Sequence, residues 1–157
     1  MTIELVQQLE RSETKLVGYT VAVSLNQDLA EGIIIQLREQ LKAQRHYIGK
    51  QCDDGVYLVQ VYSEEEFTPD TPFESIVAVA VSEFGSLPDG MVSHTLPAGV
   101  YAKVIHTGDE IDIGDAYDFI RDQEIASLRP FDFEYWADLN AIEQGEGAIE
   151  IYLPLEV

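Results

Sequence analysis

Hydrophobic residues recur with two different periods along the first half of the chain. Between residues 15 and 25, valine and tyrosine alternate with small or polar residues, which predicts a β-strand. Between residues 26 and 47, apolar residues fall four apart, which predicts an amphipathic helix, with Asp28 and Glu31 spaced like a capping box near its start. Two further stretches with strand character follow, at 55–63 and 73–85. The first half is therefore predicted to fold as β-α-β-β.

The same order of elements returns in the second half, after a passage rich in glycine and proline. Residues 100–108 have the composition of a strand, and residues 112–128 have the three-to-four spacing of an amphipathic helix. Two more stretches with strand character close the chain, at 131–139 and 148–157. The two halves share no visible residue-level repeat, so the duplication is one of pattern and not of sequence.

Together these elements predict an α+β fold. At 157 residues the chain has the length of one domain, 1–157, with two β-α-β-β units at about 14–85 and 96–157. Two such units can pair edge to edge into one antiparallel sheet with two long helices on one face. We then expect a central groove between the helices, where a small molecule can bind.

The charge of the chain limits its partners. It carries 29 acidic and 9 basic residues, a net charge of −20, which repels nucleic acid phosphates and lipid headgroups and attracts cations and basic surfaces. Solubility alone also explains such a charge. The longest apolar runs, such as 76–81, are far shorter than the ~20 residues that span a bilayer, and the N-terminus has no signal core. We expect a cytoplasmic protein that contacts neither membranes nor nucleic acid directly.

Cysteine and histidine give no sign of a metal or a cofactor. Cys52 is the only cysteine, which excludes an internal disulfide and any cysteine-rich metal site. The three histidines are far apart and lack the spacing of a metal motif; they are His46, His94 and His106. The sequence also lacks a Gly-x-Ser-x-Gly nucleophile motif and a phosphate-binding glycine loop. No metal, cofactor or catalytic residue is predicted.

Four segments of the second half carry a family resemblance. They are LPAGVYAKVIHTG at 96–108, IGDAYDFI at 113–120, FDFEYW at 131–136 and IEIYLPL at 149–155. In this order they resemble the GyrI-like effector-binding domain family, which also forms the ligand-binding part of some AraC- and MerR-type multidrug regulators. The resemblance implies a duplicated β-α-β-β domain whose groove takes up small molecules, often bulky aromatic cations, around a buried acid. Because no basic helix-turn-helix precedes residue 15, we expect a stand-alone effector-binding protein.

The resemblance places Glu134 at the position of the buried acid. Alternation along the strand puts Asp132, Glu134 and Trp136 on one face. A carboxylate in an apolar groove wall selects for ligands that combine a positive charge with a flat apolar surface, so the predicted partner is a small organic cation. In the family, the tyrosine equivalent to Tyr152 often lines the groove. Further candidates for the groove wall are Tyr19 and Tyr57 on strands and Tyr117 on a helix.

Two departures from the family pattern affect the groove. The family often places an aromatic residue after the His-x-Gly corner, whereas His106-Thr107-Gly108 is followed here by Asp109, Glu110 and Ile111. The passage from helix to strand at 127–136 is also shorter than in many relatives. We therefore expect the groove to be more acidic or differently shaped at this corner.

Several alternatives compete with the cation-binding hypothesis. Glu134 is also compatible with a surface ion pair to Arg129 or Arg121. Some family members are proposed hydrolases, in which Glu134 would be the base and Tyr19 or Tyr152 the acid. Because the family name comes from a gyrase inhibitor, an acidic regulator of a basic protein such as a DNA topoisomerase is a third hypothesis. The sequence predicts neither the ligand, a protein partner nor the oligomeric state.

Overall fold

The computed structural model describes residues 2–3, 7–62, 68–126 and 129–155. Within them lie nine strands: β1 (Thr2–Ile3), β2 (Gln7–Arg11), β3 (Thr14–Val23), β4 (Val56–Val61), β5 (Phe73–Val81), β6 (Val92–Leu96), β7 (Gly99–Thr107), β8 (Phe131–Trp136) and β9 (Ala148–Pro154). The helices are α1 (Leu25–Glu31), α2 (Ile33–Gln44), α3 (Ile113–Asp122) and α4 (Leu139–Glu143), with short 3-10 turns η1 (Arg45–Tyr47) and η2 (Glu110–Asp112).

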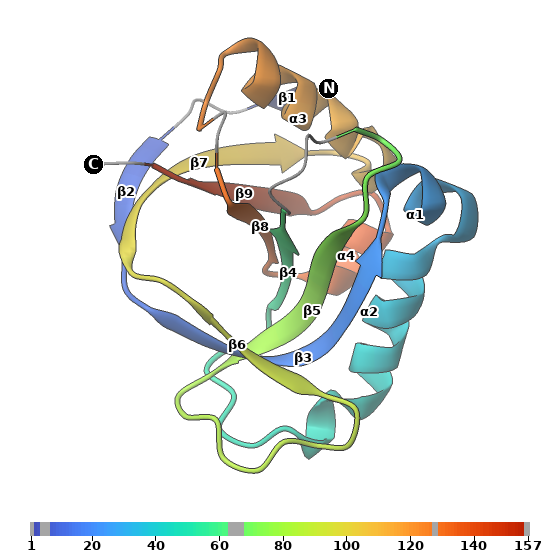
Figure 1. The fold of residues 1–157 in the computed structure, drawn as a ribbon, viewed down its shortest axis with the longest axis vertical. Coiled ribbons are helices and arrows are strands. Elements are labelled where there is room, and N and C mark those ends of the chain that lie inside the picture. The colour runs from blue at the N-terminus through green and yellow to red at the C-terminus, as the bar shows by residue number, and fades with distance from the viewer. Residues whose placement is uncertain (1, 4–6, 63–67, 127–128, 156–157) are drawn as a thin grey trace.

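All the strands belong to one antiparallel sheet. Its order is β1-β7-β9-β8-β4-β5-β3-β6, and β2 also pairs with β7. At one end of this order β2 pairs with β7, and at the other end β3 pairs with β6. The chain runs directly from β2 into β3 and from β6 into β7, so these two ends are joined and the sheet curls round on itself (Figure 1). The predicted α+β class is confirmed.

The order of elements in each half matches the prediction. The first half contains β3, the helices α1 and α2, then β4 and β5, and the second contains β7, α3, β8 and β9. The halves meet where β4 pairs with β8, in the register that places Leu58 opposite Glu134. The strand that carries Glu134 is therefore central in the sheet. The assignment of the two halves as repeats stays a prediction.

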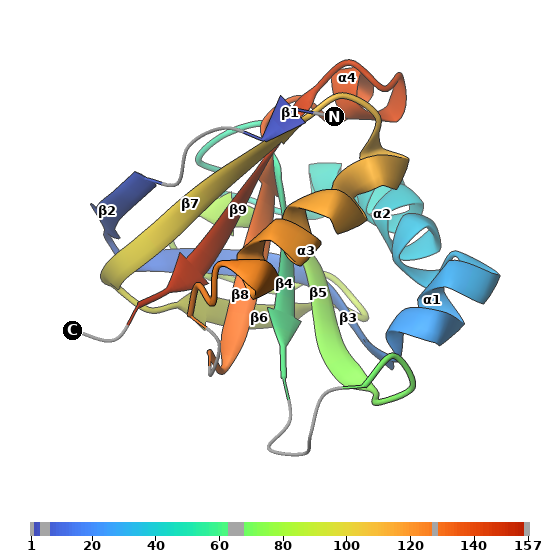
Figure 2. The same ribbon diagram turned by 90° about the horizontal axis from the view of Figure 1, so that it is seen from above.

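Two hydrophobic layers lie on opposite faces of the sheet. On the outer face, Leu41 of α2 and Ile120 of α3 pack on strand residues such as Val77 and Val104. On the inner face of the curl, a second cluster contains Leu16 and Phe133 among its buried members. Figure 2 shows α2 and α3 on the same side of the sheet, crossing its strands. This arrangement puts the helix-facing side chains of β8 between the two helices.

The predicted first helix is divided in two. Gly32 adopts a left-handed conformation, φ 62° and ψ 40°, which ends α1 and starts α2 in a new direction. Ser24 caps α1, accepting a hydrogen bond from the Gln27 amide, so the predicted capping box of Asp28 and Glu31 is wrong. Asp28 instead accepts a hydrogen bond from the Ile34 amide at 2.8 Å, at the start of α2.

β2, β6 and α4 are among the elements that were not predicted. β2 and β6 pair with β7 and β3, but their side chains are mostly polar or half-exposed, so neither shows a hydrophobic alternation. α4 is a single short helix in the acidic passage between β8 and β9, capped by Asp138. Along the described parts of the chain, no helix has the length and apolar character needed to cross a bilayer.

We predict that Gly18 is required for the central packing of β3 against β5. An added methyl group there would overlap the Val77 carbonyl oxygen and lie 2.5 Å from the Ala78 Cα, both in the backbone of β5. Gly18→Ala should therefore lower the free energy of unfolding by about 1–3 kcal/mol, measured by urea denaturation. Gly49→Ala is the control, because nothing lies within 4 Å of its added methyl group. Equal stability of the two variants would contradict this packing.

Candidate functional site

Glu134 lies in the middle of β8 and points toward the helices. Its neighbours in the sheet are Leu58 of β4 and Ile151 of β9, both members of the outer hydrophobic layer. Only 5% of the residue is exposed. The strand alternation that was predicted for residues 132–136 thus places a carboxylate in an apolar setting beneath α2 and α3.

Two neutral donors hold the Glu134 carboxylate, one on each oxygen. The Tyr117 hydroxyl on α3 donates to Oε2 at 2.5 Å, and the Trp136 indole N–H donates to Oε1 at 3.0 Å. Neither arginine proposed as an ion-pair partner contacts it. Arg129 pairs with Asp132 at 2.9 Å, and Arg121 pairs with Asp118 on the surface of α3. Among the described residues, Glu134 has no cationic partner within ion-pair distance.

Burial controls the protonation of this carboxylate. Desolvation raises the pKa of Glu134 from 4.5 to about 7, against the opposite effect of the hydrogen bonds from Tyr117 and Trp136. The nearby charges of Asp132 and Glu110 contribute a smaller part of the same rise. Burial also raises the pKa of the Tyr117 hydroxyl well above its ordinary value, so this tyrosine stays protonated and acts as a donor. Glu134 is therefore poised to lose or gain a proton near neutral pH.

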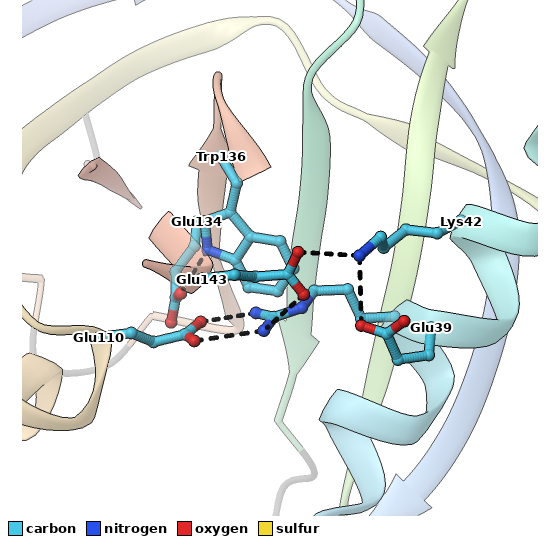
Figure 3. Close-up of polar contacts among 7 residues, drawn as sticks. Glu39, Lys42, Glu110, Glu134, Trp136 and Glu143 are labelled. Atoms are coloured by element: carbon cyan, nitrogen blue, oxygen red, sulfur yellow. Dashed lines mark hydrogen bonds and ion pairs between the residues drawn. The ribbon is translucent and has the colours of Figure 1, made fainter. Parts of the chain in front are cut away.

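Arg38 of α2 lies directly beside this carboxylate and its tryptophan. The residue is 3% exposed, and its guanidinium carbon is 5.0 Å from the centre of the Trp136 ring. Its two terminal nitrogens contact both oxygens of Glu110, at 2.6 and 3.2 Å, which is a bidentate arginine-carboxylate pair. One of these nitrogens also lies 3.7 Å from Glu143. The carboxylates of Glu110 and Glu143, both labelled in Figure 3, therefore contact the same guanidinium.

A second cation holds Glu143 in place. Lys42, one turn after Arg38 on α2, contacts Glu143 at 2.8 Å and Glu39 at 3.3 Å (Figure 3). The hydrogen bond with Glu143 raises the pKa of Lys42, and the same bond lowers the pKa of Glu143. The charged contacts therefore join α2 to η2 and α4, and each of the acids involved has a basic partner.

The family of the chain follows from a family model that covers most of its length. The model for Cass2, described as an integron-associated effector binding protein, matches residues 9–155. The chain belongs to this family. Cass2 is a GyrI-like family, so the resemblance noted in the sequence is confirmed. A comparison with curated proteins gave no match.

Solved structures show the same fold at low sequence identity. An integron cassette protein from the mobile metagenome of Vibrio cholerae has a TM-score of 0.68 at 18% identity, over 98% of this chain and 97% of that chain. SAV2435, solved bound to tetraphenylphosphonium, has a TM-score of 0.74 at 13% identity, over 98% and 94%. The C-terminal domain of EcmrR has 0.67 at 20% identity, over 99% of both chains. In the EcmrR-DNA complex, the match covers 57% of that longer chain.

In this Cass2-family chain, the six residues predicted to line the groove do not form one site. Glu134, Trp136 and Tyr117 are in direct contact. Tyr57 and Tyr152 belong to the inner layer on the opposite face of the sheet, where their rings lie 5.9 and 4.8 Å from the Phe133 ring. Neither contacts Glu134. Across β8 and β9, Tyr152 is paired with Phe133 and not with Glu134.

Tyr19 is on the correct face but three strands away from the carboxylate. It stands opposite Val77, and that row of the sheet continues through Leu58 to Glu134. At about 4.8 Å between neighbouring strands, this places it roughly 14 Å away. Its ring lines a separate surface hollow of about 440 Å³ with Gln44, Tyr47 and the loop at 86–89. Tyr19 therefore belongs to another part of the surface.

Sequence reasoning missed Arg38, Glu110 and Glu143 as parts of the site. A signal for Arg38 was present, because it falls at helical spacing among Ile34, Leu37 and Leu41, on the apolar side of α2. Glu110 was noted as a departure from the family pattern, and its contact with Arg38 now explains it. No group of acidic, histidine or cysteine residues with the geometry of a metal site occurs in the portions of the chain that the structure describes.

We predict that Glu134 makes stability depend on pH. Because its pKa is raised in the folded state, stability is fully present below about pH 4.5 and falls as the pH rises through about 7. The shift corresponds to about 3 kcal/mol. The free energy of unfolding of the wild type should fall by this order, relative to that of Glu134→Gln, between pH 4.5 and 8.

Glutamine is a suitable neutral replacement for this comparison. Its oxygen can accept from Trp136, while its amide nitrogen donates to the Tyr117 hydroxyl oxygen. Other buried acids, such as Asp132, titrate in both proteins and cancel in the difference. Parallel stability curves for the two proteins would show that Glu134 does not carry the shifted pKa.

Proposed function

We propose that this protein binds small organic cations with a flat apolar surface, at Glu134 between α2 and α3. The observation that carries this proposal is the state of the Glu134 carboxylate. It is buried, and within the described part of the chain its hydrogen-bond donors are the neutral groups of Tyr117 and Trp136. In contrast, the nearby acids have basic partners: Asp132 has Arg129, Glu110 has Arg38 and Glu143 has Lys42.

An unmatched buried charge favours a ligand that supplies the opposite one. Ionised Glu134 is unfavourable in this apolar site, and a cation beside it removes part of that penalty. The adjoining Trp136 ring attracts the same cation through its π face and offers apolar contact to a flat ligand. A neutral ligand gains only the apolar contact. The combination therefore favours lipophilic cations over neutral molecules of the same shape.

The similar structures support this class of ligand. SAV2435 shares the fold and was solved with tetraphenylphosphonium, a bulky cation that carries four aromatic rings. Membership of the effector-binding family independently supports small-molecule binding. The identity of the natural ligand is left open by both findings, and the charge preference proposed for this chain is based on Glu134.

A second candidate function, hydrolysis of a reactive small molecule, is favoured by one contact. Tyr117 donates to Glu134 at 2.5 Å, which brings a general acid and a base with a pKa of about 7 together in a buried site. The tyrosine in this pair is Tyr117. Tyr152, which was predicted from the sequence, lies on the opposite face and donates to Glu150.

We predict that cation binding is saturable and depends on Glu134. Trp136, the only tryptophan, reports on the site by fluorescence. Lipophilic cations such as tetraphenylphosphonium should quench it, whereas a neutral analogue of the same shape should not. Glu134→Gln should weaken binding by about 1–3 kcal/mol, because the neutral side chain no longer attracts the cation. Glu83→Gln is the matched control, since it removes the same charge from an exposed position.

Binding should also depend on pH in a way that identifies the carboxylate. A cation prefers ionised Glu134, so binding displaces a proton below the pKa of about 7. Affinity at pH 6 should be about tenfold weaker than at pH 8 in the wild type and in Glu83→Gln. This dependence should be absent in Glu134→Gln. Equal affinity for cations and neutral analogues, or identical pH profiles in all three proteins, would reject the proposal.

The hydrolase alternative is tested by mass balance. A bound ligand that carries an electrophilic group should be converted to its hydrolysis product only if the Tyr117–Glu134 pair is catalytic. Tyr117→Phe and Glu134→Gln should each abolish product formation, followed by mass spectrometry. Unchanged ligand after prolonged incubation with the wild type would leave binding as the function.

A further inference from the structure

We propose, building on the proposed function, that Arg38 occupies the cation position of the groove in the free protein and that a ligand must displace it. Arg38 takes no part in holding the Glu134 carboxylate, which is bonded to Tyr117 and Trp136. Its guanidinium is instead placed where a cationic ligand would be expected. The side chain is therefore an internal competitor for the ligand.

The position of the guanidinium excludes a second cation. It lies 5.0 Å from the centre of the Trp136 ring, which is the cation–π contact proposed for the ligand. Trp136 is only 2% exposed and Arg38 only 3%, so the tryptophan has no open face while the arginine is in place. A ligand that stacks on Trp136 must first move Arg38 toward solvent.

The contacts of Arg38 make this movement feasible. Its partners Glu110 and Glu143 are partly exposed side chains on η2 and α4, so both can stay paired with the arginine as it turns outward. Lys42 keeps its own contact with Glu143. In the buried position, the Nε–H of Arg38 has no hydrogen-bond acceptor among the described residues. Leaving this donor unpaired is unfavourable, and water would satisfy it after displacement.

We call the position that the Arg38 guanidinium occupies the slot. The same contacts indicate which kind of cation the slot favours. Arg38 presents a planar, delocalised cation whose central carbon lies 5.0 Å from the centre of the Trp136 ring and whose two terminal nitrogens bond the Glu110 carboxylate. An amidinium or guanidinium on an aromatic ring can reproduce both contacts, whereas an ammonium group has only a point charge. With Arg38 removed, the slot should prefer planar cations.

The test uses benzamidinium and benzylammonium as probes of the same size, titrated at pH 8 while Trp136 fluorescence is followed. Arg38→Ala should bind benzamidinium at least about tenfold more tightly than the wild type, if the groove of the wild type is open for less than about a tenth of the time. The gain for benzylammonium should be smaller. Arg121→Ala is the matched control, because it makes the same charge change at a position that is 74% exposed.

Equal gains in Arg38→Ala and Arg121→Ala would overturn the inference, because the effect would then be general electrostatics. No gain in a folded Arg38→Ala, verified by thermal unfolding, would overturn it as well. These results are distinct from failure of the proposed function. A wild type that binds no lipophilic cation, together with an Arg38→Ala variant that binds benzamidinium, would reject the proposed function of the wild type and retain Arg38 as the occupant of the slot.

A second variant keeps the test independent of the stability of Arg38→Ala. Glu110→Gln retains the arginine but removes the charge that holds it. Removing an acid from a cation site would ordinarily weaken binding. If Glu110 holds an internal competitor, the affinity for tetraphenylphosphonium, which has no N–H group to bond residue 110, should instead rise by a few fold. Unchanged or weaker binding in Glu110→Gln would count against displacement.

Discussion

The burial of one carboxylate sets the properties of the candidate site. Glu134 is in β8, the strand through which the second half of the sheet pairs with β4 of the first, and alternation directs it toward the helices. Tyr117 and Trp136 satisfy its oxygens without neutralising its charge. The raised pKa of Glu134 follows from this desolvation, and the proposed attraction for a cation depends on the same buried charge.

The proposed attraction for a cationic ligand and the proposed competition from Arg38 arise from different elements of the fold. Glu134 belongs to the sheet, and Arg38 belongs to α2, which is held to η2 and α4 by Glu110 and Glu143. Desolvation fixes the attraction, since Glu134 cannot move out of a central strand. The competition depends on how firmly two partly exposed acids hold Arg38. A substitution at Glu110 or Glu143 can therefore change how firmly Arg38 is held while Glu134 stays buried in β8.

Sequence patterns predict those parts of this site that depend on residues close together in the chain, and not those that depend on distant contacts. Alternation is local, so it placed Glu134 and Trp136 on one face correctly. It could not say which face the helices cover. Tyr152 was placed in the groove by the family resemblance, and in the structure it pairs with Phe133 on the inner face. The break at Gly32 and the polar strands β2 and β6 had no hydrophobic pattern to reveal them. The contact between Arg38 and Glu110 joins residues 72 positions apart, which no local pattern encodes.

That distant contact gives physical meaning to a departure from the family pattern. An aromatic residue after the His-x-Gly corner would extend an apolar groove, whereas Glu110 draws an arginine into it. A buried arginine without such a partner would be strongly unfavourable, and Glu110 without Arg38 would add another negative charge beside Glu134, whose pKa it already raises. Each residue therefore makes the other tolerable. Together they place a cation beside Trp136, at the position proposed for the ligand, while the sheet that carries Glu134 stays the same.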